Sequence, residues 1–200
     1  GFAQRVLVLD LDAHPPDGIA ECLLDANEVW IGSLSGVNWG PIERADETVL
    51  PKNCSDEPYL EALRGLLGRM PEGGIAFVVA GGDVLANDPM GGLGLTLAGA
   101  RQRDLLVAAA LRHTPSVWLP GGGYSADAWR LLAGTALVLA LGSSEPVPES
   151  YDALRAQFRR IAREVQVEAL EGDIGLTHAD LLAGLGQGGV GRVLGYYTAE

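Results

Sequence analysis

The sequence feature that most constrains the fold is an apolar run at residues 6–9 that leads directly into acids and a histidine. Continuous branched apolar residues are typical of a strand buried on both faces, as in a parallel sheet. Asp10, Asp12 and His14 follow at every second position, and alternate side chains on an extended backbone project to the same side. Such charges need compensation, which a divalent metal such as zinc supplies. A strand end that is simply polar is the alternative.

Further apolar runs alternate with helix signals along the chain. Strands are expected at residues 5–12, 28–34, 75–80 and 116–120, with a short extended piece near 48–51. Helices are expected from Ser55 to about residue 70, from Thr96 to about 113, from Ser125 to about 141, over 151–171, and from about Thr177. This order predicts an α/β fold, with a parallel sheet sandwiched between helices in three layers. We expect residues 1–142 to form this domain and residues 143–200 to form a linker and a helical extension packing on it.

Composition and charge exclude several classes of protein. The formal net charge is -12, from 26 acidic and 14 basic residues, so a nucleic-acid-binding surface is not expected. Cys22 and Cys54 are isolated, which favours free thiols in a reducing cytoplasm. No signal peptide is recognised, and the longest apolar stretch, near 129–141, is interrupted and too short to cross a membrane.

Polar residues or glycines follow each expected strand. Ligands of parallel α/β sheets bind beyond the carboxyl ends of the strands. Asp83, which follows Gly81 and Gly82, is the natural partner of Asp12 and His14. These residues would form a three-ligand zinc site with one open position for water, the pattern of catalytic zinc.

Tyr124 follows a glycine run at residues 121–123, after the fourth expected strand. Its phenol could stabilise the oxyanion of a tetrahedral intermediate. The alternative is a tyrosine that only precedes a helix.

The motifs together resemble the zinc-dependent histone deacetylases and their bacterial relatives, the acetylpolyamine and acetoin-utilisation amidohydrolases. They are DLDAHPPDG at 10–18, SL at 33–34, GGD at 81–83, DPMG at 88–91, LGLT at 93–96 and GGGY at 121–124. They occur in the family's order and at similar spacing, over about residues 5–142. The resemblance implies the arginase/deacetylase fold and hydrolysis of an acyl group from an amine such as acetyl-lysine or acetylpolyamine.

The resemblance also implies roles for individual residues. It makes Asp12, His14 and Asp83 the zinc ligands and Tyr124 the carbonyl-polarising phenol. Asp10 and Asp17 match the acids that orient the family's paired catalytic histidines. A monovalent-cation site for K⁺ or Na⁺ matches Asp10, Asp12, His14, Ser33 and Leu34, partly through backbone carbonyls.

The chain departs from the family in its histidines, which are His14, His113 and His178 and include no His–His pair. His113 and His178 are expected to be structural residues at helix ends. We therefore expect a chain lacking the family's N-terminal part, inactive by itself. Such a chain would leave an unpaired strand edge and an apolar sheet face, to be covered by another chain or by self-association.

Alternatives remain open at this point. The chain could be a non-catalytic metal-binding or assembly module. A two-manganese ureohydrolase is a weaker alternative, because Pro16 and Leu85 stand where further acidic ligands are needed. Trp39, in the loop after the second expected strand, could line a substrate channel or simply pack.

Overall fold

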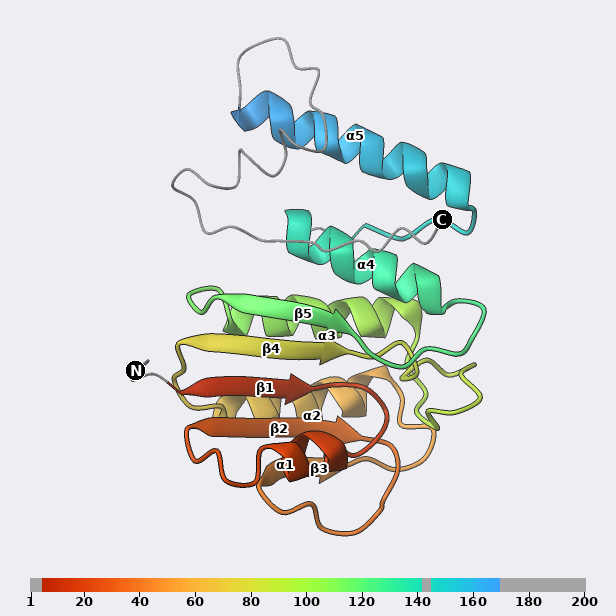
Figure 1. The fold of residues 1–200 in the computed structure, drawn as a ribbon. Helices are drawn as coiled ribbons and strands as arrows, with labels where there is room; N and C mark the ends of the chain where they lie inside the picture. Colours follow the sequence, from red (N-terminus) through yellow and green to blue (C-terminus); the bar gives the residue numbers. More distant parts are fainter. Residues whose placement is uncertain (1–4, 142–144, 170–200) are drawn as a thin grey trace.

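The centre of the protein is a five-stranded sheet in the order β3-β2-β1-β4-β5. The computed structural model describes residues 5–141 and 145–169. The strands are β1 (Val6–Asp10), β2 (Val29–Ser35), β3 (Ala45–Val49), β4 (Ile75–Ala80) and β5 (Ser116–Pro120). All pairs are parallel, so every carboxyl end lies at one edge (Figure 1).

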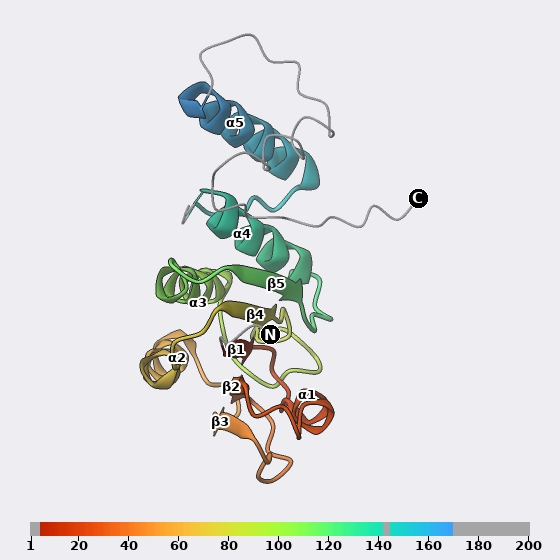
Figure 2. The same ribbon diagram turned by 60° about the vertical axis from the view of Figure 1, so that its left-hand side comes forward.

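Helices cover the two sheet faces unequally. They are α1 (Asp17–Cys22), α2 (Asp56–Arg69), α3 (Leu97–Ala110), α4 (Ala128–Leu141) and α5 (Tyr151–Ala169). Helices α2 and α3 lie on one face, and α1 lies on the other (Figure 2). Because β1 connects to β2 through α1, whereas β3 connects to β4 through α2, the connections change face between β1 and β4. Such a switch point places a crevice beyond the strand ends.

The main core lies between the sheet and helices α2 and α3. Leu7 and Leu9 of β1 pack with Tyr59 and Leu63 of α2 and with Val107 of α3, all of them buried. Alternate β1 residues therefore face this layer, as the period of a strand requires. The predicted α/β fold with a parallel sheet between helices is confirmed.

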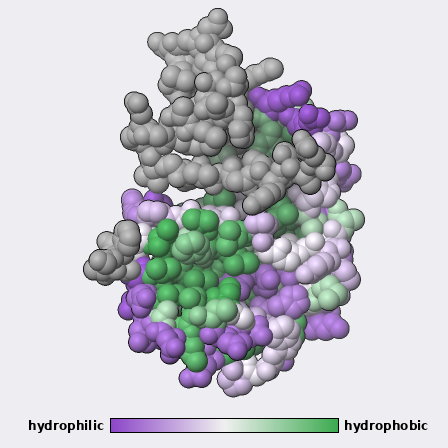
Figure 3. All heavy atoms as spheres, in the orientation of Figure 1, coloured by the Kyte–Doolittle hydropathy of each residue, from purple (hydrophilic) through white to green (hydrophobic). Residues whose placement is uncertain are grey.

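The opposite face is only partly covered. Helix α1 buries Ala20 against Val8 and Ile31. Beyond α1, the side chains of Ile75, Phe77, Val79, Val117 and Leu119 form what we call the open sheet face. Val117 and Leu119 are 41% and 44% exposed, and the region is a continuous hydrophobic surface in Figure 3.

Most predicted elements are present, with three local differences. Strand β1 ends at Asp10 rather than at residue 12, because the chain turns after the Leu11 N–H donates to Val79 O. Strand β3 begins at Ala45, earlier than the expected piece near 48–51. Helix α1 was not expected, since a six-residue helix is too short to show a helical period.

Two of the three predicted cap residues, Ser55 and Thr96, stand directly before their helices, whereas α4 begins at Ala128, three residues after the predicted cap Ser125. Thr96 precedes α3, and its Oγ1 accepts the Gly99 N–H at 3.0 Å. Ser55 precedes α2 but makes no side-chain capping bond. The helix expected near Thr177 lies outside the described residues.

Helix α5 packs beside α4 through Leu137, Val147 and Leu154, as an amphipathic segment requires. The boundary expected at residue 142 stays a prediction. In the part of the chain that the structure describes, no helix is long and apolar enough to cross a membrane.

Candidate metal centre

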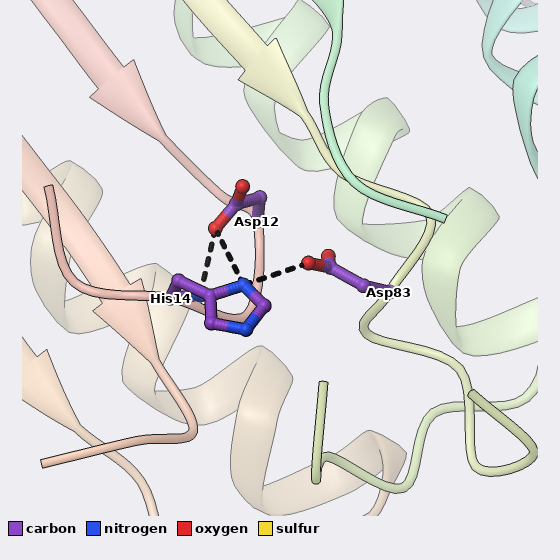
Figure 4. Close-up of side chains that lie close together, drawn as sticks. All are labelled: Asp12, His14 and Asp83. Carbon is purple, nitrogen blue, oxygen red and sulfur yellow. Dashed lines mark hydrogen bonds and ion pairs between the residues drawn. The ribbon is translucent and has the colours of Figure 1, made fainter. Parts of the chain in front are cut away.

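The candidate site forms where β1 and β4, neighbours in the sheet, both end. Asp12 and His14 lie on the loop after β1, and Asp83 lies after Gly81 and Gly82 on the loop that follows β4. One ligand atom from each of these side chains lies within 4.8 Å of the others. Figure 4 shows the three side chains converging from the two loops. The sequence thus correctly predicted which residues meet.

Hydrogen bonds hold this cluster in place. His14 Nδ1 lies 3.0 Å from Asp83 Oδ2 and 3.8 Å from Asp12 Oδ1. The His14 backbone N–H donates to Asp12 Oδ1 at 2.7 Å, and the Ala13 N–H donates to Asp83 Oδ1 at 3.0 Å. Each carboxylate therefore keeps one oxygen on the backbone, and the Ala13 bond joins the two loops directly.

Negative charge is concentrated here in a buried place. Asp83 is fully buried. Its pKa is raised mainly by this burial and, to a smaller extent, by the negative charge of Asp12. Burial, reinforced by the charge of Asp12, raises the pKa of Asp10 to about 7. A cation bound nearby would stabilise the ionised carboxylates and so lower these pKa values. The carboxylates of Asp12 and Asp83, together with the imidazole of His14, fit a divalent metal such as zinc.

Glycines allow the loops to approach the carboxylates. A Cβ at Gly81 would overlap Asp12, and a Cβ at Gly122 would overlap the Asp83 carboxylate. The Gly82 N–H also donates to the Gly122 carbonyl. The glycine run after β5 thus closes against the loop after β4 because neither carries a side chain there.

Tyr124 stands on this glycine loop but outside the three-residue cluster. Its side chain is 61% exposed, and its backbone N–H donates to Asp88 Oδ2 at 2.7 Å. Asp88 Oδ2 also accepts the Ser125 N–H, while Oδ1 accepts the N–H groups of Met90 and Gly91. A single buried carboxylate therefore ties the loop after β5 to the loop after β4.

Of the other predicted site residues, some are buried in the sheet and some are exposed on loops or on α1. Asp10 pairs in register with Ser33, and Ser33 and Leu34 are fully buried. The Ser33 Oγ has no hydrogen-bond partner among the described residues. Asp17 is exposed in the first turn of α1. Trp39 is 56% exposed, and its ring centroid lies 6.0 Å from that of His14.

Two residues near the site carried no role in the sequence-based prediction. Asp88 was seen only as part of a motif, although an acid before Pro89 is a frequent side-chain acceptor in turns. Arg103 is fully buried behind the ligand loops. Its sequence signal is a polar run, RQRD at 101–104, inside an otherwise apolar helix, and this run does not reveal which of its side chains faces inward.

Comparison with known proteins places the chain in a family. A family model described as the histone deacetylase domain matches residues 1–139. An uncharacterized protein of Picosynechococcus sp. is 33% identical over 134 residues, which cover 62% of this chain and 44% of that protein. Histone deacetylase 2 of Arabidopsis thaliana is 31% identical over 141 residues, which cover 65% of this chain and 36% of that protein.

Solved structures share the fold. A crystal structure of an HDAC homologue complexed with SAHA matches with a TM-score of 0.60 at 23% identity, covering 78% of this chain and 46% of that one. An HDAC homologue from Aquifex aeolicus matches with the same TM-score at 25% identity and the same coverage. The chain therefore spans less than half the length of these relatives. Because the family model matches well over half of its residues, the chain belongs to the histone deacetylase domain family.

Proposed function

We propose that the chain carries the metal-binding part of a metal-dependent amide hydrolase that removes an acetyl or other acyl group from an amine. Acetyl-lysine and acetylpolyamines are the expected substrate classes. The observation that supports this most is the convergence of Asp12, His14 and Asp83 at the ends of two adjacent strands. Family membership gives the same direction, towards deacetylase chemistry.

Asp12, His14 and Asp83 would hold the metal, with zinc the expected ion. Two carboxylates and one imidazole leave an open coordination position, as catalytic zinc requires. When bound, the metal would polarise the substrate carbonyl and activate a water molecule. The exposed phenol of Tyr124 would donate a hydrogen bond to the carbonyl oxygen of the substrate as charge develops on it.

Hydrolysis also needs a proton acceptor. Residues 1–200 contain no His–His pair that could serve as one. His113 precedes β5 and so lies at the opposite edge of the sheet from the cluster. General-base catalysis typically contributes 10²–10⁴-fold to a rate. We therefore propose that hydrolysis needs histidines from outside these 200 residues, which Asp10 and Asp17 would orient.

The first test is metal binding by the 200-residue chain. Elemental analysis should give one zinc per chain, and D83N and H14A should lose it. D25N, at an exposed aspartate after α1, is the control and should bind like the wild type. Equal zinc content in all four proteins would contradict the assignment.

The second test is hydrolysis of a fluorogenic acetyl-lysine peptide. The 200 residues alone should be slow, and a chimera that adds the N-terminal segment of the Aquifex aeolicus homologue upstream should be active. A zinc-loaded, folded chimera that hydrolyses neither acetyl-lysine nor acetylpolyamines would instead favour a non-catalytic metal-binding module. The missing His–His pair is the observation behind that second candidate.

A two-manganese site has less support. Pro16 and Leu85 are both buried, and neither side chain offers a ligand atom. Two metals per chain in the elemental analysis would revive that alternative.

A monovalent cation, K⁺ or Na⁺, is proposed beside Asp10. The buried Ser33 Oγ has no described hydrogen-bond partner, and the facing Asp10 carboxylate is deeply buried. Buried polar groups of this kind need a partner. Unfolding midpoints in KCl and in choline chloride of equal ionic strength should differ for the wild type and coincide for D10N.

A further inference from the structure

A fully buried cation lies directly behind the ligand loops. Arg103 in α3 has 0% of its surface exposed, and its guanidinium reaches backbone carbonyls just beyond the ends of β1 and β4. A buried charge is costly unless it is paired and hydrogen-bonded. The contacts of this side chain therefore indicate what keeps it there.

One nitrogen of Arg103 bonds both loops that carry the candidate ligands. Nη1 donates to the Leu11 carbonyl at 3.2 Å and to the Gly81 carbonyl at 2.8 Å. Leu11 immediately precedes Asp12, and Gly81 stands two residues before Asp83. A single side chain thus spans the gap between the end of β1 and the end of β4.

The neighbouring Asp104 balances the charge of the guanidinium and anchors it. Arg103 Nε donates to Asp104 Oδ1 at 2.9 Å, and Asp104 itself is 1% exposed. The Thr135 Oγ1 in α4 donates to Asp104 Oδ2 at 2.6 Å. Asp104 therefore offsets the charge of Arg103 and ties it to α4 through Thr135. Only the planar fork of arginine reaches an acid and two carbonyls at once.

From these contacts we propose that Arg103 is a positioning residue of the metal centre, holding the Leu11 and Gly81 carbonyls so that Asp12, His14 and Asp83 converge. The inference rests on the proposed metal site and adds to it a group that touches neither metal nor substrate. Outer groups that orient metal ligands typically contribute 10–100-fold to metal affinity.

The test compares two variants of the buried pair. R103M alone would remove one partner of the buried Asp104 carboxylate and could fail to fold, so R103M/D104N is the variant measured. It removes both charges together and keeps an oxygen for Thr135. T135V is the matched control, because it removes a bond to Asp104 in the same network without touching either carbonyl.

Zinc affinity is measured by competition with a chelator. R103M/D104N should bind zinc at least 10-fold more weakly than the wild type, whereas T135V should stay within about 2-fold. The Co²⁺-substituted double variant should also show an altered visible absorption spectrum. If Arg103 had a merely structural role, both variants would lose stability, but their zinc affinity and Co²⁺ spectrum would stay like those of the wild type.

A metal-free measurement separates this inference from the metal centre itself. The Ala13 amide donates to Asp83 and so reports how the two loops sit together. Its hydrogen exchange in chelator should speed up in R103M/D104N relative to core amides of α2, and should not do so in T135V. A wild type that binds no zinc would overturn the metal centre, and Ala13 exchange would then decide the role of Arg103. Unchanged Ala13 exchange together with unchanged affinity would overturn it.

Discussion

At the scale of single residues, the acidic cluster stores unfavourable charge in the metal-free protein. Asp10 has a pKa of about 7 in the folded state against an ordinary value of 3.8. The folded state therefore holds more protons than the unfolded state between about pH 4 and pH 7. The contribution of Asp10 to the stability of the metal-free protein should therefore be most favourable below this window and should fall as the pH rises through it.

The variant D10N removes this penalty. Because an amide cannot ionise, metal-free D10N should exceed the wild type in free energy of unfolding at pH 8, by up to about 4 kcal/mol, and should differ less at pH 4.5. Its Oδ1 can still accept the Asp12 N–H. Urea unfolding in chelator and choline chloride, without Na⁺ or K⁺, at the two pH values checks this, with D25N as the control. A difference between D10N and wild type that does not depend on pH would contradict it.

Asp88 is the second residue whose chemistry makes a clear prediction. In wild type, Asp88 Oδ2 accepts the N–H groups of Tyr124 and Ser125. In D88N, an amide NH₂ placed there would face two donors and could accept neither bond. We expect stability to fall by about 1–3 kcal/mol. Because Tyr124 would lose its anchor, kcat of the active chimera should fall by about 10–100-fold while zinc remains bound.

The control for D88N is N87A, which removes an exposed bond to Asp127. N87A should leave kcat unchanged. If D88N retains full kcat, Asp88 does not position Tyr124.

At the scale of the elements, a single acid joins the start of α2 to the start of α3. Asp56, the first residue of α2, accepts the Thr96 N–H at 2.8 Å and the Thr96 hydroxyl at 2.7 Å. A Cβ at Gly99 would overlap the Asp56 carboxylate. Thus the close approach of the two helices depends on glycine at this position of α3.

Replacing two glycines with alanine should have opposite effects. G99A should lower the free energy of unfolding by about 1–3 kcal/mol, because Asp56 must move and lose its bonds to Thr96. G68A in α2 has open space around the new Cβ and should raise it by up to about 1 kcal/mol through helix propensity. Urea unfolding measures both, and a shift of the same sign would contradict the packing argument.

Elements and ligands differ in how far the sequence predicts them. The apolar runs of β1 and β4 and the cap at Thr96 are local signals, so their elements fall within a few residues of expectation. The convergence of Asp12, His14 and Asp83 was predictable because parallel neighbouring strands end together. The grip of Arg103 on two carbonyls was not, since it depends on the rotation of α3 against the sheet. A short helix such as α1 carries no period to detect.

At the scale of the whole molecule, the open sheet face is the conspicuous surface. Apolar side chains of β4 and β5 form it, and it is contiguous in Figure 3. Contiguous apolar surface of this kind marks an interaction site or promotes association. We propose that another polypeptide, or a second copy of the chain, covers it.

Self-association of the 200-residue chain tests this proposal. Light scattering after size exclusion at tens of micromolar should give a mass above the 20.9 kDa of one chain. The double variant V117K/L119K should move towards the monomer, because two charges on the open sheet face disfavour burial. L24K alters an exposed leucine at the end of α1 and should behave like the wild type. A monomeric wild type that binds no apolar dye would contradict the proposal.

The pairing of loops at the ends of β1 and β4 has one further consequence. His14 and Asp83 are 69 residues apart in sequence, and their side chains meet at 3.0 Å. A metal held between them would act as a removable cross-link that closes most of the sheet into one loop, much as a disulfide does. Adding chelator would remove this cross-link without changing the polypeptide. The metal concentration around the protein would therefore set its free energy of unfolding.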